Sequence, residues 1–235
     1  MTQSEKTRRL VIFGNSAFAE IAFEYFTWDS PYEVVGFTVN EAYLKEPVLA
    51  GLPVVSFECL EQHFPPGDVD IFVAVTYQQL NGLRARLVAE AKERGYALAS
   101  YVSTRAFVWR NVKLGEHCFI FENNVIQPFV SIGDNVILWS GNHIGHHSRI
   151  DDNCFISSHV VLSGYTHIGS NCFLGVNATI GNNVTIGQDC WFSPNGMTTK
   201  NVAAGSLLSS PVSEVSKIST YRLFKVPKPD DAASP

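Results

Sequence analysis

An aliphatic side chain recurs at every sixth position through the second half of the chain, from Val102 to Ile186, and Phe192 closes the series. The residue four places after each aliphatic position is usually small, and glycine often follows the aliphatic residue directly. An internal period this regular indicates a stacked solenoid, and a period of six residues is typical of a parallel β-helix. The positions between the ends of the series are Val108, Leu114, Ile120, Ile126, Ile132, Leu138, Ile144, Ile150, Ile156, Leu162, Ile168, Leu174 and Ile180.

A second period, of eighteen residues, is superimposed on the first. Because eighteen is three hexads, the chain predicts a triangular coil of three short strands, with successive coils about 4.8 Å apart. Asn and Asp tolerate the left-handed backbone conformation of a tight corner, and cysteine is small enough to fill an inward slot. The cysteine spacing follows the scaffold and resembles no zinc pattern, which favours buried thiols over a metal site or a disulfide. The two series are Asn135, Asn153, Asn171 and Asp189, and Cys154, Cys172 and Cys190.

The first hundred residues alternate between strand-like and helix-like segments. Apolar runs predict strands over 10–13, 33–39, 52–55 and 70–76, and helical spacing predicts helices over 14–26 and 81–94. This alternation predicts a small parallel sheet. Ligands of such sheets bind beyond the carboxyl ends of the strands. The candidate binding residues at these ends are Gly14, Asn15, Ser16, Asn40, Thr76 and Tyr77.

Three domains or segments are predicted from these patterns. We predict an α/β N-terminal domain with a small Rossmann-like parallel sheet over residues 1–100. A left-handed parallel β-helix of hexapeptide repeats follows over 101–200. Residues 201–235 are expected to form an exit loop, a helix over 212–224 and, from residue 226, a frayed tail.

Composition excludes several kinds of partner. Hydrophobic residues make up 46% of the 235-residue chain and charged residues 17%, with a net charge of −5, which is typical of a globular protein. The chain has no run rich in Lys and Arg, so a nucleic-acid partner is not expected. No apolar run approaches the roughly 18 residues of a membrane span. Residues 6–13 resemble the start of a signal peptide, but their apolar core is short, and Asn15 and Ser16 interrupt the segment after it. We therefore expect a cytoplasmic protein whose five cysteines are thiols.

Histidine is the main candidate for chemistry. Six of the seven histidines lie in the β-helix half. The two corner residues that follow glycine in a hexad should point outward, which places His146 and His147 outside on one corner. An outward histidine is usually only solvated, but histidine is also the natural general base near neutral pH and often needs a second group to orient its ring. The seven are His63, His117, His143, His146, His147, His159 and His167.

Several segments together resemble one protein family. They are the strand and turn of residues 10–20, residues 72–76, Asn81-Gly-Leu-Arg84, the hexads (above all residues 163–177) and the loop of residues 199–206. Over nearly the whole chain the sequence is similar to bacterial sugar acyltransferases, which include sialic-acid O-acetyltransferases and N-acetyltransferases of nucleotide-linked amino sugars. The resemblance implies acetyl transfer from acetyl-CoA to an amino group of a nucleotide-linked sugar, in surface glycan biosynthesis.

The resemblance also implies roles for particular residues. Homotrimers form side by side, acetyl-CoA lies in the groove between neighbouring β-helices, and the first domain holds the nucleotide sugar. His146 stands third in its hexad, as the general base of the family does, with His147 beside it. Gly164, one coil later, matches a position whose backbone contacts CoA, and Lys200 is placed to meet a CoA phosphate. No metal is expected.

The chain departs from the family pattern at four places. His147 replaces an acidic residue, and Phe155 replaces a second histidine that often contacts the acyl group. The turn at Gly14 lacks the fuller glycine run of the family, and Asn40 replaces an acidic residue. A sugar O-acetyltransferase and a non-catalytic β-helix binding protein remain alternatives. So does a zinc hydratase, although His146 and His147 have no third histidine in their column.

An aromatic stripe is expected on the outside of the β-helix, at Phe119, Phe155, Phe173 and Trp191. Exposed patches of this size are unusual on a monomer. The stripe therefore predicts either a seam between trimer subunits or a surface covered by the C-terminal segment.

Overall fold

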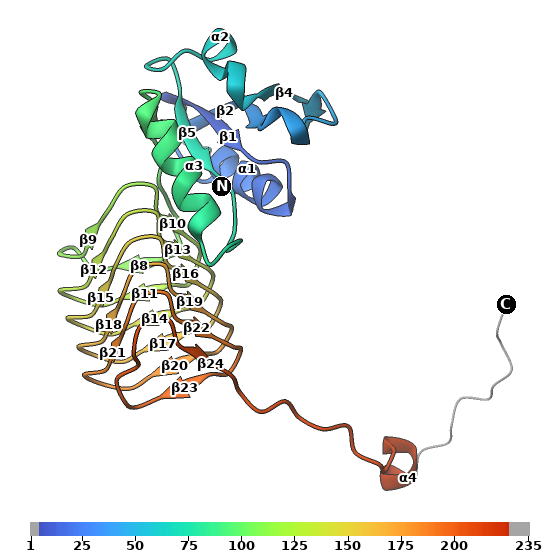
Figure 1. Ribbon diagram of the computed structural model, residues 1–235, viewed down its shortest axis with the longest axis vertical. Helices are drawn as coiled ribbons and strands as arrows, with labels where there is room; N and C mark the ends of the chain where they lie inside the picture. The colour runs from blue at the N-terminus through green and yellow to red at the C-terminus, as the bar shows by residue number, and fades with distance from the viewer. Residues whose placement is uncertain (1–4, 226–235) are drawn as a thin grey trace, which may run out of the picture.

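The computed structural model describes residues 5–225. The tail expected to fray from residue 226 lies outside this range. The first half folds around a twisted sheet, and the second half is a prism of stacked coils below it (Figure 1). The helix expected over 212–224 is wrong in length, since only α4 (Thr220–Phe224) is helical there.

A six-stranded sheet forms the centre of the first half, in the order β3-β4-β2-β1-β5-β6. Neighbouring strands run parallel except β3, which pairs antiparallel with β4, so the sheet is mixed at one edge rather than wholly parallel. The strands are β1 (Arg8–Phe13), β2 (Tyr32–Val39), β3 (Val48–Leu49), β4 (Leu52–Ser56), β5 (Asp70–Val73) and β6 (Ala97–Leu98). The helices are α1 (Ala17–Trp28), η1 (Glu41–Tyr43), η2 (Phe57–Cys59), α2 (Leu60–His63) and α3 (Gly82–Glu93).

Three flat walls form the left-handed β-helix, and each wall is a parallel sheet with one two-residue strand per coil. The first wall holds β7 (Tyr101–Val102), β10 (Phe119–Ile120), β13 (Ile137–Leu138), β16 (Phe155–Ile156), β19 (Phe173–Leu174), β22 (Trp191–Phe192) and β24 (Leu207–Leu208). The second wall holds β8 (Phe107–Val108), β11 (Val125–Ile126), β14 (His143–Ile144), β17 (Val161–Leu162), β20 (Thr179–Ile180) and β23 (Met197–Thr198). The third wall holds β9 (Lys113–Leu114), β12 (Ser131–Ile132), β15 (Arg149–Ile150), β18 (His167–Ile168) and β21 (Thr185–Ile186).

The hexad pattern explains both the interior and the corners of the prism. From Ile120 onward the recurring aliphatic residues, with most of the small residues four places later, pack into one buried core that includes Cys154, Cys172 and Cys190. In the first coil Val102 and Leu114 are exposed, because no coil precedes them to cover them. Corner positions have positive φ, as expected for Asn135, Asn153, Asn171 and Asp189. A residue other than glycine at such a corner is strained unless it tolerates the left-handed region, which explains the asparagines.

The aromatic stripe is covered by the first half of the same chain. Phe119 and Phe155 are buried, together with Phe173, in a cluster that includes Phe18 of α1 and Phe72 of β5. Neither a trimer seam nor the C-terminal segment covers this wall, so that expectation is wrong. The hexad pattern shows which wall is apolar, but the part of the chain that covers this wall is decided by contacts between residues far apart in the sequence.

A buried arginine joins the two halves. Arg84 of α3 is fully buried, and its guanidinium donates to Asn135 Oδ1 at 2.9 Å, to the Asn153 carbonyl at 3.1 Å and to the Thr76 carbonyl at 2.6 Å. Burial lowers the Arg84 pKa to about 9. The nearby Asn81 amide adds hydrogen bonds to the carbonyls of Asn171 and Cys172.

His117 is buried in the same junction and does not project into solvent as corner histidines were expected to do. The Val73 backbone N–H donates to His117 Nε2 at 2.8 Å, so Nδ1 carries the hydrogen and donates to Asn135 Oδ1 at 2.9 Å. Burial, together with the nearby Arg84 charge, lowers the His117 pKa to about 3. This histidine is a neutral structural link between the sheet and the prism.

Candidate active site

The corner between the second and third walls carries the predicted catalytic pair. After β14 the chain turns through Gly145, His146 and His147, and His147 adopts φ of 59°. The same corner position in the neighbouring coils is occupied by Phe129 and Tyr165. The His147 ring stacks between them, with ring centroids 4.5 Å from Phe129 and 4.8 Å from Tyr165. This column holds the exposed His147 ring in one orientation.

His146 is exposed beside this column and is held by several contacts. Its backbone N–H donates to Gln127 Oε1 at 2.9 Å, and its Nδ1 lies 3.2 Å from His147 Nδ1. One of these two nitrogens must donate and the other must accept. When His146 Nδ1–H is the donor, its Nε2 keeps a lone pair and is able to accept a proton.

Gly164 provides the space under the His146 ring. A Cβ atom at Gly164 would lie 2.7 Å from His146 Cε1 and 2.8 Å from Nε2, closer than real contacts allow. Lys200 stands at the same corner position three coils after His146, roughly 14 Å along the prism at about 4.8 Å per coil. The structure therefore brings His146, His147, Gly164 and Lys200 onto one corner.

A second set of predicted residues meets at the carboxyl edge of the first-half sheet. Gly14, Asn15, Ser16 and Asn40 line a cavity of ≈ 370 Å³, together with Val75, Gln78 and Arg86. Gly14 has φ of +131°, and a Cβ there would lie 3.0 Å from the Ala74 carbonyl oxygen. Glycine is therefore required at this turn even though the fuller glycine run is missing.

Sequence reasoning missed Glu58, whose carboxylate lies against Asn40. Its carboxylate accepts hydrogen bonds from Ser56 Oγ at 2.7 Å, from the Glu41 backbone N–H at 2.9 Å and from Asn40 Nδ2 at 3.2 Å. Burial raises the Glu58 pKa, but these hydrogen bonds outweigh burial and lower it to about 2. No local signal in the sequence links Glu58 to Asn40, because the two residues are 18 apart in the chain.

Thr76 and Tyr77 lie at a different cavity from the other predicted binding residues. They line a space of ≈ 480 Å³ between the two halves, with Trp139, Phe155 and Ser157 on its other side. The Tyr77 ring packs on Phe155 and Phe173 at centroid distances of 5.2 and 4.7 Å. The first half packs on the first wall, so these cavities lie on another side of the prism from the corner of His146.

Two other kinds of feature, metal-binding clusters and membrane-spanning helices, are not found among residues 5–225. Within that range, no three or more His, Cys, Asp or Glu side chains gather as a metal-binding group. In the same described part of the chain, no helix is long and apolar enough to cross a membrane. The absence of a required metal stays a prediction.

Comparisons with known proteins agree with this architecture. Residues 111–146 and 130–164 match the model of the bacterial transferase hexapeptide (six repeats), and residues 165–192 match that of the hexapeptide repeat of succinyl-transferase. No curated protein sequence matches the chain.

Solved structures match over most of the chain. Perosamine N-acetyltransferase PerB from Caulobacter crescentus, in complex with CoA and GDP-perosamine, is 26% identical with a TM-score of 0.75, over 87% of this chain and 95% of that one. The acetyltransferase domain of PglB from Neisseria gonorrhoeae FA1090 is 23% identical with a TM-score of 0.75, over 86% and 96% of the two chains. These matches confirm the resemblance to hexapeptide-repeat sugar acyltransferases that the sequence indicated.

Proposed function

We propose that this chain, a hexapeptide-repeat protein with the architecture of sugar acyltransferases, is an acetyl-CoA-dependent N-acetyltransferase of a nucleotide-linked amino sugar. The observation that carries the proposal is the exposed His146 imidazole, which lies over Gly164 with its Nδ1 paired to His147. The similarity to PerB, which was solved with CoA and GDP-perosamine, supports this pair of substrates.

His146 acts as the general base in this proposal. The sugar amine attacks the thioester carbonyl, the new C–N bond forms, and the C–S bond to CoA breaks. His146 Nε2 takes the proton from the amine and returns a proton to the CoA sulfur. His147 accepts the hydrogen bond from His146 Nδ1–H, which orients the ring and keeps Nε2 free for the proton.

The corner of His146 also accounts for binding of acetyl-CoA. Gly164 has no side chain, so the His146 ring lies directly against its backbone, and a thioester bound beside the ring would lie next to this position. Lys200, roughly 14 Å further along the same corner, is able to reach a phosphate of the same extended molecule.

The domain of residues 1–100 is proposed to hold the nucleotide sugar. Gly14, Asn15, Ser16 and Asn40 surround a cavity at the carboxyl edge of the sheet, where nucleotides bind to folds of this kind. Thr76 and Tyr77 would contact the sugar in the neighbouring cavity. The domain of residues 101–200 supplies the catalytic corner, and residues 201–235 follow it.

A homotrimer would bring these two parts of the site together. The second wall presents a mainly apolar outer column, with Phe107 52% exposed and Met197 70% exposed. Val125 and Val161 lie between them, and His143 and Thr179 interrupt the column. The third wall presents Lys113, Arg149 and His167 instead. An exposed apolar wall next to the His146 corner is a suitable subunit seam. A neighbouring copy would then place its nucleotide-sugar cavity opposite His146.

The cellular setting is part of the same proposal. Acetyl-CoA and nucleotide sugars are cytoplasmic metabolites of surface glycan assembly, so we place the reaction in the cytoplasm. The five cysteines, which are all free thiols among the described residues, suit a reducing compartment.

The test is thiol release from acetyl-CoA with a panel of nucleotide-linked amino sugars. Wild type should release thiol with one of them, and His146→Ala should be slower by about 10²–10⁴-fold, the usual contribution of a general base. His159→Asn, at an exposed corner histidine on another edge of the prism, is the matched control and should remain active. Release with hydroxyl sugars only would identify an O-acetyltransferase, and full activity of His146→Ala would exclude His146 as the base.

A further inference from the structure

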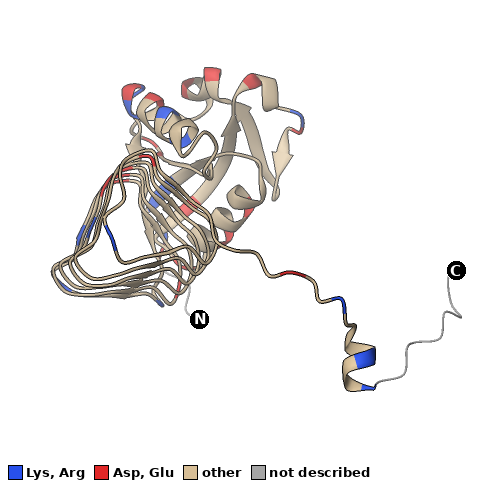
Figure 2. Ribbon diagram, turned by 60° about the horizontal axis from the view of Figure 1, so that its bottom comes forward, with Lys and Arg blue, Asp and Glu red and all other residues tan. Residues whose placement is uncertain are grey.

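The described part of the chain finishes in an exposed arm, which comprises residues 209–225 and is called here the C-terminal arm. It leaves the prism after β24 and projects away from the rest of the molecule (Figures 1 and 2). Every residue from 211 to 225 is exposed, with Val212 at 88% and Val215 at 95%.

The arm carries a regular apolar pattern together with positive charge. Apolar residues recur at every third position, and Lys217, Arg222 and Lys225 outnumber the one acidic residue, Glu214. A continuous exposed series of this kind is unusual on a monomer and indicates a partner. The chain as a whole has a net charge of −5, so its other surfaces attract a basic arm. The apolar positions are Val212, Val215, Ile218, Tyr221 and Phe224.

The far end of the arm is a preformed helical turn. Ser219 Oγ accepts a hydrogen bond from the Arg222 backbone N–H at 3.3 Å, and the Lys225 N–H bonds to the Tyr221 carbonyl. These bonds stay within the arm. The turn α4 therefore presents Tyr221, Arg222 and Phe224 as one compact group of exposed side chains.

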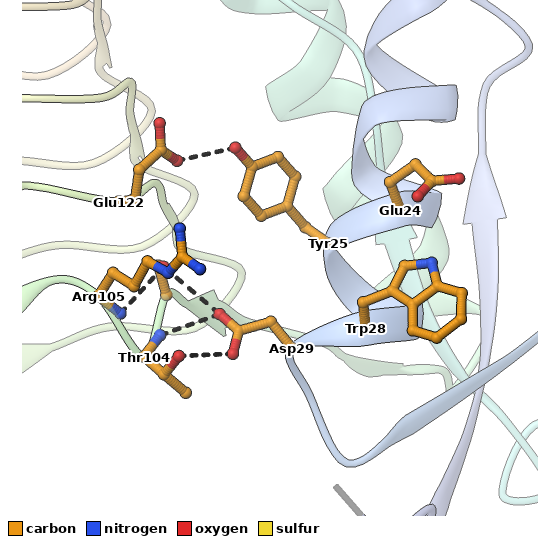
Figure 3. A pocket seen from close by; sticks show the side chains of 8 residues that line it. Glu24, Tyr25, Trp28, Asp29, Thr104, Arg105 and Glu122 are labelled. Carbon is orange, nitrogen blue, oxygen red and sulfur yellow. Dashed lines mark hydrogen bonds between the residues drawn. The ribbon is translucent and has the colours of Figure 1, made fainter. Parts of the chain in front are cut away.

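A complementary cavity lies where α1 meets the first coils of the β-helix, and it is called here the junction cavity (Figure 3). It has a volume of ≈ 380 Å³. Glu24 and Trp28 are four residues apart on α1 and so share one face of it, and Trp28 is 59% exposed. The other lining residues are Tyr25, Asp29, Ser103, Thr104, Arg105 and Glu122.

Hydrogen bonds keep two carboxylates of the junction cavity ionised. Asp29 accepts from Tyr101 Oη and Thr104 Oγ1, both at 2.6 Å, and Glu122 accepts from Tyr25 Oη at 2.8 Å. Burial raises the pKa of both carboxyls, but these hydrogen bonds outweigh burial and lower it. An indole face beside carboxylates is suited to a guanidinium, which stacks on the ring and pairs with the acid.

We propose that α4 of one copy docks into the junction cavity of a second copy, with Arg222 over the Trp28 ring and beside the Glu24 carboxylate. Charge complementarity supports this pairing, since the arm is basic and the cavity carries three carboxylates against one arginine. The reach is sufficient for a second copy whose prism lies alongside in the same direction. The arm leaves the seventh strand of the first wall, roughly 29 Å along the prism from the first coil, and residues 209–220 span up to about 40 Å when extended.

Cysteine crosslinking between copies tests the proposal without any assay of acetyl transfer. Glu24→Cys protein carrying a tag is mixed with untagged Arg222→Cys protein, both in a Cys59→Ser background, and is oxidised. We expect a disulfide-linked dimer that contains one copy of each kind. Thr185→Cys, at an exposed position on the third wall, is the matched control and should not crosslink to Arg222→Cys. No mixed dimer, or one no more abundant than the control gives, overturns the proposal.

A charge swap then distinguishes specific docking from chance collision. In full-length protein, Arg222→Glu and Glu24→Arg should each weaken assembly between copies about five- to tenfold, measured by sedimentation over a concentration series. The double variant should recover most of the loss. Equal losses without recovery, or no loss in either single variant, would contradict the pairing. A Glu24→Cys/Arg222→Cys protein that closes only within one chain would place the arm on its own body and likewise contradict it.

Discussion

The Nδ1 atoms of His146 and His147 lie 3.2 Å apart, and the His147 ring is itself clamped between Phe129 and Tyr165. His147, held between two aromatic rings, thus stands where the family resemblance leads us to expect an acidic residue. A neutral imidazole is able to accept the hydrogen bond but does not supply a negative charge. The column compensates in geometry, since it fixes the orientation of the accepting ring.

Replacement of His147 should show whether this side chain acts by orienting the His146 ring through a hydrogen bond, since a neutral imidazole supplies no negative charge. His147→Asn keeps an acceptor and suits the positive φ, so we expect kcat within a few-fold of wild type. His147→Ala removes the acceptor and should lower kcat by roughly tenfold, less than the about 10²–10⁴-fold loss expected for the base itself. Steady-state kinetics with the amino sugar found for wild type measures both. Equal activity of His147→Ala and wild type would show that His147 does not orient the base.

A methyl group at Gly164 should block the site while the fold stays intact. The added Cβ would lie 2.7 Å from the His146 ring, so the ring must move out of position. We expect Gly164→Ala to lose at least about tenfold in kcat/KM, because small displacements of a catalytic group are costly. Gly181→Ala is the control, in the next coil but one position earlier in its hexad, where the nearest atoms would be 3.3 Å away. Similar kinetics for the two variants would argue against a site at this corner.

The buried His117 should make the protein sensitive to acid. Its pKa is about 3 in the folded protein and about 6.5 when unfolded, so between these values the unfolded state binds more protons. The free energy of unfolding should therefore fall by up to about 1.4 kcal/mol for each pH unit as the pH drops from 6.5 toward 3. Above pH 6.5 this contribution is fully present.

Urea denaturation at pH 7 and pH 5 measures this effect. His117→Asn keeps a residue suited to the corner and removes the titration, so its stability should change less between the two pH values. His159→Asn, at an exposed corner with φ of 60°, is the control and should retain the wild-type dependence. An unchanged slope in His117→Asn would assign the acid sensitivity to other groups.

Shortening the buried cation should destabilise the junction between the halves. Lys at position 84 keeps a charge but has no planar fork to satisfy the carbonyls of Thr76 and Asn153 together with Asn135. We expect Arg84→Lys to cost roughly 2–4 kcal/mol of unfolding free energy. Arg86→Lys, two residues later and exposed, should change stability by less than about 0.5 kcal/mol. Urea denaturation measures both variants, and equal denaturation midpoints would contradict a structural role for Arg84.

Much of the architecture was predictable because it repeats. Each coil of the prism meets an almost identical coil, so the aliphatic positions, the inward cysteines and the corner asparagines carry the same information many times. The turn at Gly14 and the end of β2 at Asn40 were placed at one sheet edge for a similarly simple reason, since parallel strands end on the same side.

The rest depended on contacts between distant parts of the chain. Nothing local in the sequence shows that Arg84 and His117 are buried at a junction, that Glu58 reaches Asn40, or that Thr76 and Tyr77 face Phe155 rather than Gly14. The antiparallel strand β3 was missed, and the helix that ends at Phe224 was predicted too long, because a two-residue strand and a single helical turn have little periodicity.

The sequence by itself determined the prism and the outward corner of His146, because hexad periodicity is a local pattern that stacking enforces coil by coil. Only the tertiary structure decided that the first half covers the aromatic stripe, which buries His117 and holds Tyr77 against Phe155 and Phe173. The physical reason is that burial of apolar area lowers the free energy for any two surfaces of matching shape. The choice among such surfaces is made by specific polar contacts, here those of Arg84, Asn81 and His117, whose partners lie tens of residues away in the chain.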